Sequence, residues 1–158
     1  MAQAQVSEYA LKAAFLYNFA KFVEWPAEAF SSPSAPLVLC TYGNNRVGDA
    51  LQDIVKEKTI DGRTLAVREI GNAVGSKGCQ VLFVGAAVSR DEESILASVR
   101  NEDVLVVGET PEFAQNGGAI NFVVRGNRLR FIVNLSATDT ARLKLSSKLL
   151  SLAILAGN

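Results

Sequence analysis

The chain has 158 residues, 49% of them apolar, and this length and composition suit one compact domain with a substantial core. Its 16 Lys and Arg balance 16 Asp and Glu, so the net charge is zero. This balance argues against a nucleic-acid groove and against electrostatic attachment to an anionic membrane. No run of about eighteen apolar residues occurs, so no membrane insertion is predicted.

The segment from Glu8 to Pro26 predicts one amphipathic helix that ends at the proline. Its apolar side chains fall on one wide stripe: Leu11, Phe15, Leu16, Phe19, Phe22 and Val23. Glu8 and Lys12 project into this stripe four residues apart, in the order that favours an ion pair on a helix. The stripe is either a core face with charged ends or a docking face, and the core interpretation is favoured.

After this helix, strands and helices alternate. Apolar runs bounded by turn residues predict strands, and apolar residues at helical spacing predict helices. In chain order these are a strand at 36–42, a helix at 47–56, strands at 64–70 and 79–84, a helix from an N-cap at Ser89 to about Arg100, and a strand at 104–107. Continuous apolar strands in this order indicate a mostly parallel sheet covered on both faces.

The end of the chain departs from this alternation. Two apolar runs, 119–125 and 128–133, flank Gly126-Asn127, which predicts an antiparallel β-hairpin. The tail, 137–155, is predicted to be helical, with Ser146 or Ser147 capping a last helix. Four leucines of this tail are expected to close the core: Leu149, Leu150, Leu152 and Leu155.

These patterns predict an α/β fold. We expect a single domain over residues 1–158, with a mixed, mostly parallel sheet, helices on both faces and a C-terminal antiparallel hairpin. Residues 1–5 are expected to be disordered or to be an addition that precedes the domain.

Few residues suggest catalytic chemistry. The chain has no histidine, which excludes histidine-dependent nucleophiles and removes the commonest metal ligand. The acidic run 91–93 is typical of the first turn of a helix. Gly43 and Gly48 have the spacing of a phosphate loop, but Asp49-Ala50 stand where that loop needs Lys and then Ser or Thr. No cofactor or metal is predicted, an enzyme using only carboxylates is disfavoured, and a binding or regulatory role is favoured.

Two features leave alternatives open. Cys40 and Cys79 permit a disulfide, although two buried thiols are the simpler interpretation in a reducing compartment. Arg125, Arg128 and Arg130 bracket the hairpin and are able to hold an anion, although solvated surface charges are the commoner explanation.

Three segments, in order along nearly the whole chain, resemble the YfiR family of small bacterial periplasmic proteins. The first runs from Leu11 to Pro26 and contains an Asn-Phe-x-x-Phe-x-x-Trp-Pro string. The second covers 117–122 and 126–134, and the third covers 143–153. Within these segments the residues assigned structural roles are Lys12, Phe15, Asn18, Phe19, Phe22, Trp25, Pro26 and Asn134.

The resemblance implies a non-enzymatic periplasmic protein from which a leader peptide has been removed. Such proteins bind and repress the periplasmic sensor domain of an inner-membrane diguanylate cyclase, so that cyclic di-GMP and biofilm formation fall. The resemblance also implies that the protein forms a homodimer and that an outer-membrane lipoprotein can sequester it. Because the periplasm is oxidising, the resemblance favours a Cys40–Cys79 disulfide.

The expected partner surface is the hairpin edge together with the last helix. The hairpin residues assigned to partner binding are Phe122, Arg125, Arg128, Arg130 and Phe131. The family's small-ligand pocket falls at Lys144 and Ser146 in this sequence. The alternative function is therefore a periplasmic receptor in which these arginines or Lys144 grip an anionic or aromatic metabolite.

Overall fold

The computed structural model describes residues 7–156, apart from the side chains at positions 73 and 74. Its α-helices are α1 (Glu8–Phe22), α2 (Asn45–Val55), α3 (Glu92–Ser98), α4 (Leu135–Thr140) and α5 (Ser147–Leu152). Short 3-10 helices are η1 (Ala27–Ala29), η2 (Ala73–Ser76) and η3 (Ala86–Asp91). The expectation for residues 1–5 lies outside the described residues.

The strands of the described chain form a main sheet and one small pair. They are β1 (Val23–Glu24), β2 (Leu37–Tyr42), β3 (Thr59–Ile60), β4 (Arg63–Glu69), β5 (Val81–Val84), β6 (Leu105–Gly108), β7 (Ile120–Arg125), β8 (Arg128–Val133), β9 (Lys144–Leu145) and β10 (Ile154–Leu155). The main sheet has the order β10-β8-β7-β6-β5-β2-β4-β3, and β1 pairs with β9.

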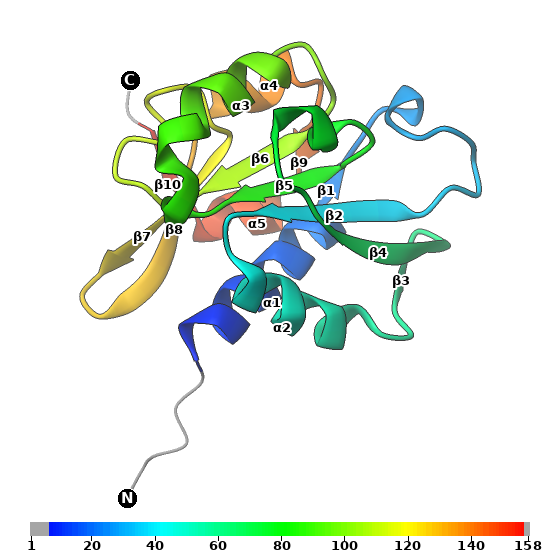
Figure 1. Ribbon diagram of the computed structural model, residues 1–158, viewed down its shortest axis with the longest axis horizontal. Coiled ribbons are helices and arrows are strands. Elements are labelled where there is room, and N and C mark those ends of the chain that lie inside the picture. Colours follow the sequence, from blue (N-terminus) through cyan, green and yellow to red (C-terminus); the bar gives the residue numbers. More distant parts are fainter. Residues whose placement is uncertain (1–6, 157–158) are drawn as a thin grey trace, which may run out of the picture.

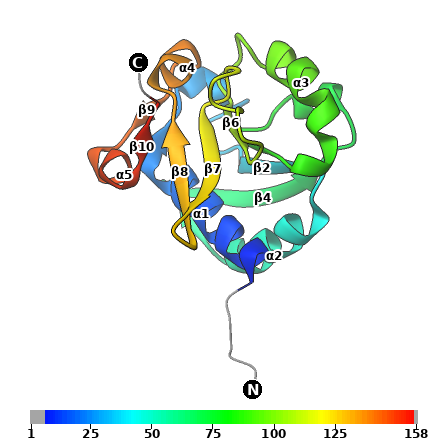
Figure 2. The same cartoon turned by 90° about the vertical axis from the view of Figure 1, so that its left-hand side faces the viewer.

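The sheet is mostly parallel, as predicted. Strands β4, β2, β5, β6 and β7 run parallel, in the 2-1-3-4-5 order of one group of doubly wound folds. Strand β8 returns antiparallel to β7, and β3 is antiparallel to β4. Helices α1 and α2 cover one face, and α3 and α4 cover the other (Figures 1 and 2). The predicted α/β fold class is confirmed.

Strand alternation divides the core into two layers. In β2, Leu37 and Leu39 belong to the core cluster beneath α1 and α2, whereas Cys40 and Tyr42 belong to the cluster beneath α3. Both faces of the central strands are therefore buried, as continuous apolar runs predict.

A disulfide joins Cys40 in β2 to Cys79, just before β5. The two Cα atoms lie 5.9 Å apart and the cysteines are 39 residues apart in the sequence. Both side chains are buried in the layer beneath α3. The bridge that the resemblance favoured is confirmed.

The segment that leaves α1 is tied to the sheet through Gln80. The indole N–H of Trp25 donates to the Gln80 carbonyl oxygen (3.1 Å). The buried Gln80 side chain donates to the Ala29 carbonyl oxygen (2.7 Å) and accepts from the Val38 N–H (2.7 Å). Trp25 and the Pro26 that follows it thus lie where the chain turns from α1 towards β2.

The prediction of Ser89 as an N-cap is wrong. Residues 86–91 form η3, and α3 begins at Glu92. The hydroxyl of Tyr42 donates to Asp91 (2.6 Å), and that of Thr110 donates to Glu92 (2.5 Å). Asp91 and Glu92 therefore bind the side chains of one residue at the end of β2 and one residue just after β6. The local sequence around Ser89 does not predict these contacts.

The helical tail is only partly confirmed. Ser146 caps α5 by accepting from the Leu149 N–H (3.1 Å), and Leu149 is buried. However, Leu152 and Leu155 are 59% and 51% exposed, so the expectation that they close the core is wrong. The physical reason is that α5 ends at Leu152 and the chain then extends to pair with β8 as β10.

Reduction of the disulfide should lower the melting temperature by several degrees. Opening a loop of this length restores chain entropy to the unfolded state, with an upper estimate of about 4 kcal/mol. Differential scanning calorimetry with and without reductant measures the shift. The Cys40→Ser/Cys79→Ser variant is the control and should not respond to reductant, whereas an unchanged wild-type melt with two titratable thiols would contradict the prediction.

Candidate functional site

The tip of the β7–β8 hairpin projects from the body of the molecule (Figure 1). We define the hairpin tip as residues 123–130. Gly126 and Asn127 have φ values of 59° and 63°, the left-handed pair that a two-residue type I′ turn requires. Glycine and asparagine adopt this conformation most readily, so the predicted turn is confirmed.

The base of the hairpin is held by an aromatic cluster. Phe122 of β7 and Phe131 of β8 lie opposite each other and face α1. The ring of Phe19 lies 5.0 Å from that of Phe131 and 5.9 Å from that of Phe122, and Phe15 lies 5.8 Å and 6.0 Å from the same two rings. Aromatic pairs at these distances add to the stability of apolar burial.

The predicted partner-binding residues therefore divide into two groups. Phe122 and Phe131 are each only 2% exposed, and they anchor the hairpin. Arg125, Arg128 and Arg130 are exposed on its surface. Within residues 7–156, no ion pair, hydrogen bond or ring contact engages these three guanidinium groups. The surface that the hairpin offers to another molecule is thus basic, and its partner-binding role stays a prediction.

A second feature is a buried lysine at the carboxyl end of the parallel strands. Lys12 of α1 is 6% exposed and forms ion pairs with Glu8 (2.5 Å) and with Glu109, which directly follows β6. The other carboxylate oxygen of Glu109 accepts from the Ala86 N–H (2.7 Å). The predicted Glu8–Lys12 pair is confirmed, and Glu109 is the member that sequence reasoning missed.

Electrostatics keep Lys12 charged. Burial alone lowers the pKa of its ammonium group, but hydrogen bonds to Glu109 and Glu8 outweigh burial and raise the pKa above 10.5. The three side chains line a hollow of about 320 Å³ beside Phe122 and Leu129. This arrangement links α1, β6 and the loop after β5 into one polar cluster.

The crevice between β2 and β5, where doubly wound folds commonly bind ligands, is filled by the chain itself. A Cβ added to Gly85 would lie 2.8 Å from the Gly43 carbonyl oxygen, so the two loops touch through backbone. Asn44 caps α2 by accepting from the Val47 N–H (3.2 Å). A Cβ added to Gly48 would lie 3.1 Å from Thr41 Oγ1, so this glycine allows α2 to approach β2.

Two acids of the run at 91–93 are engaged by neighbouring side chains. Asp91 and Glu92 accept the hydroxyls named above, and the hydrogen bond to Asp91 raises the pKa of Tyr42. Across residues 7–156, no group of three or more Cys, Asp or Glu side chains is arranged to hold a metal ion.

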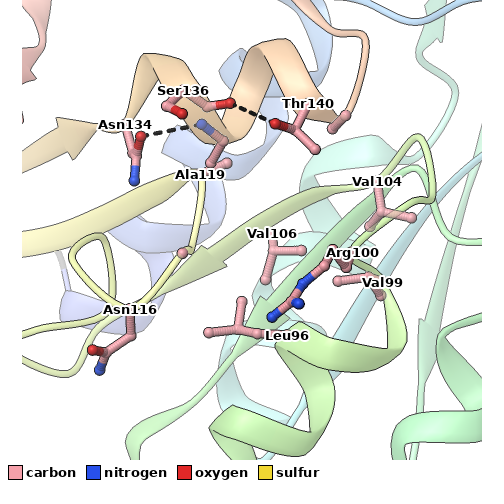
Figure 3. Close-up of a pocket in the computed structure, with 13 residues that line it drawn as sticks. Leu96, Val99, Arg100, Val104, Val106, Asn116, Ala119, Asn134, Ser136 and Thr140 are labelled. Atoms are coloured by element: carbon pink, nitrogen blue, oxygen red, sulfur yellow. Dashed lines mark hydrogen bonds between the residues drawn. The ribbon is translucent and has the colours of Figure 1, made fainter.

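A cleft of about 280 Å³ lies between α3 and α4 (Figure 3). Its apolar lining includes Leu96, Val104 and Val106, and Arg100 extends along the same wall. Asn134 lies on the opposite side, where it accepts from the Ala137 N–H (3.1 Å) to cap α4. Its amide group also donates to the Ala114 carbonyl oxygen (2.8 Å), so Asn134 links α4 to the segment before β7.

The predicted ligand residues lie elsewhere. Lys144 is exposed in β9, which pairs with β1. The Ser146 hydroxyl is engaged as the cap of α5. Of the other motif residues, Phe22 stacks under the ammonium groups of Lys21 and Lys148, and Asn18 is exposed on α1. A ligand-binding role for Lys144 and Ser146 stays a prediction.

Together, these observations describe a small α/β protein with a projecting basic hairpin. The model of the YfiR/HmsC-like family matches residues 9–154, and the chain belongs to this family. Membership of this family indicates a periplasmic regulatory protein. No helix within residues 7–156 is long and apolar enough to cross a membrane.

Two solved structures share the fold at low sequence identity. A conserved domain protein from Vibrio cholerae O1 biovar El Tor has a TM-score of 0.59 and 10% identity over 97% of this chain. The ABC domain from Streptococcus pneumonia, solved in complex with L-Trp, has a TM-score of 0.54 and 7% identity over 82% of this chain. The matches span 61% and 57% of those two chains. No curated protein matches the sequence significantly.

Replacing Lys12 by methionine should destabilise the protein by about 3 kcal/mol, because Glu109 would lose its cation in a largely buried position. Glu109→Gln in the same chain should recover much of this loss.

Because the pKa of Lys12 is raised on folding, the wild type should also lose stability above pH ~10.5, as unfolded chains release the proton first.

Urea denaturation of these variants between pH 7 and 11 measures both effects. Lys58→Met, at an exposed position before β3, is the control and should change stability by less than about 0.5 kcal/mol. A Lys12→Met protein as stable as the wild type at pH 7 would contradict a structural role for the cluster.

Proposed function

We propose that this protein is a non-enzymatic periplasmic regulator that binds the periplasmic sensor domain of an inner-membrane diguanylate cyclase and represses it. Repression lowers cyclic di-GMP and with it biofilm formation. The observation that carries the proposal is membership of the YfiR/HmsC-like family over residues 9–154, nearly the whole chain.

Two exposed surfaces support binding to another protein. The hairpin tip presents Arg125, Arg128 and Arg130, and the end of the chain presents Leu152 and Leu155. Arginine is enriched at protein interfaces, and exposed apolar side chains supply area that a partner can bury. We propose that the sensor domain of the cyclase binds the hairpin tip. The terminal leucines would then take part in homodimer formation or in binding to an outer-membrane lipoprotein.

Deletion of the gene should raise cyclic di-GMP and biofilm several-fold, provided that its cognate membrane cyclase is present. A plasmid that exports the protein to the periplasm should reverse both changes. The same chain without an export signal is the control, since it cannot meet a periplasmic domain. Cyclic di-GMP that responds to neither deletion nor export would contradict the proposal, as would a purified sensor domain that does not bind the protein.

A second candidate function is small-ligand binding, and the cleft between α3 and α4 favours it. Apolar walls beside the Arg100 guanidinium suit an anionic metabolite with an apolar or aromatic part. The streptococcal domain of similar fold was solved with L-Trp, which makes tryptophan a reasonable first probe.

A ligand of this kind should raise the melting temperature once its concentration exceeds the dissociation constant. Thermal-shift measurements with L-tryptophan and with anionic aromatic acids test this. Arg100→Gln should remove the shift if the cleft is the site, whereas Lys144→Gln should remove it if the predicted Lys144 site is used. The absence of any shift at millimolar concentrations would contradict the second candidate.

A further inference from the structure

The hairpin tip contains an arrangement that costs stability. Arg125 and Arg128 are directly opposite each other across the two strands, and like charges in that position destabilise a sheet. Arg130 is opposite Val123, two residues further along the same face. The segment 119–134 contains no Asp or Glu, and no acidic side chain within residues 7–156 pairs with these arginines. Three positive charges therefore gather on one face of a chain whose net charge is zero.

The same region has an open strand edge. Strand β10 pairs only with Ile132 and Val133 of β8, so residues 128–131 have no strand partner on that side within the described chain. Side chains alternate here, with Arg128 and Arg130 on one face and Leu129 and Phe131 on the face towards α1. Figure 2 shows the tip of the β7–β8 hairpin extending past β10.

We propose that the hairpin tip binds an extended acidic segment of a partner protein, which adds as a strand along the open edge of β8. Alternate carboxylates of that segment lie on the arginine face, and its backbone pairs with residues 128–131. The inference rests on the proposed function only for the identity of the partner, since any protein with such a segment would fit.

Geometry favours this occupant. Arginines two residues apart on a strand are separated by about 7 Å, which matches the spacing of alternate side chains on an added strand. Such a strand would lie about 4.8 Å from β8, within reach of a guanidinium. An acidic strand would also relieve the repulsion between Arg125 and Arg128. The negative charge that favours binding of the segment therefore also stabilises the hairpin tip.

An anionic lipid surface fits these observations less well. Electrostatic attachment to lipid typically uses four to eight clustered basic residues on a protein, and the hairpin tip carries three. A lipid headgroup also cannot pair with a row of backbone groups, whereas an extended peptide pairs with them along the whole edge.

The site is preorganised. Phe122 and Phe131 hold its base in the aromatic cluster, and the left-handed Gly126-Asn127 turn sets the relative position of the two strands. A partner strand therefore need not order the hairpin when it binds, which reduces the entropic cost of association.

Fluorescence anisotropy with the labelled peptide Val-Glu-Val-Glu-Val-Glu tests the proposal on the intact protein. Arg128→Glu/Arg130→Glu should weaken binding at least ~10-fold. The charge-matched control Lys56→Glu/Arg90→Glu, at two exposed positions, should leave binding unchanged. The block isomer Val-Val-Val-Glu-Glu-Glu should bind more weakly, and the fully N-methylated peptide should not bind, since it keeps the carboxylates but cannot donate from its backbone.

A second variant guards against misfolding. Arg125→Thr removes one member of the repelling pair, so it should melt no lower than the wild type and still bind the alternating peptide more weakly. Equal affinity of the wild type and the charge-reversed protein would overturn the inference. Equal affinity for all three peptides would also overturn it, as would binding to phosphatidylglycerol vesicles without binding to any peptide.

The sensor domain separates this inference from the proposed function. If Arg128→Glu/Arg130→Glu loses the alternating peptide but still binds the domain and represses the cyclase, the regulatory function stands and the cyclase is not the partner that uses this strand edge. If the wild type binds the alternating peptide but never affects the cyclase, the regulatory proposal fails and the strand-binding edge stands.

Discussion

The packing of α1 against the base of the β7–β8 hairpin determines how the rest of the molecule is arranged. Phe19 lies 5.0 Å from Phe131 and 5.9 Å from Phe122, so the start of the chain contacts a segment more than 100 residues later. An isolated two-stranded hairpin is at best marginally stable in water. The aromatic cluster stabilises this one and lets its tip extend beyond the sheet while remaining ordered.

The same packing separates polar side chains that bind one another within the fold from charged side chains that are exposed to solvent. Where doubly wound sheets commonly hold a ligand, Gly43 meets Gly85 through backbone, and Lys12 is neutralised by Glu8 and Glu109. Polar groups at this edge are therefore occupied by one another. A group of three exposed arginines lies instead on the hairpin tip, and none of them forms an ion pair within the described chain.

Membership of the YfiR/HmsC-like family and the Cys40–Cys79 bridge are both consistent with an oxidising compartment such as the periplasm. A disulfide persists in an oxidising compartment, and this one links β2 to the start of β5 beneath α3. The Gln80 contacts hold the amino ends of β2 and β5, and the bridge ties the middle of β2 to the start of β5. A regulator that acts by contact benefits from such a scaffold, because a rigid surface loses less entropy on binding.

Local sequence patterns were sufficient to predict the α/β class, the parallel strands, the Gly126-Asn127 hairpin and the Glu8–Lys12 pair. Each of these patterns involves residues that are close together in the chain. Such patterns also singled out the three hairpin arginines. Tertiary structure alone decided that Phe122 and Phe131 are buried, that Leu152 and Leu155 are exposed, and that Asp91 and Glu92 bind hydroxyls. It also brought Glu109 to Lys12 across 97 residues. The physical reason is that a strand's register and the face its side chains occupy depend on distant partners, which local patterns do not specify.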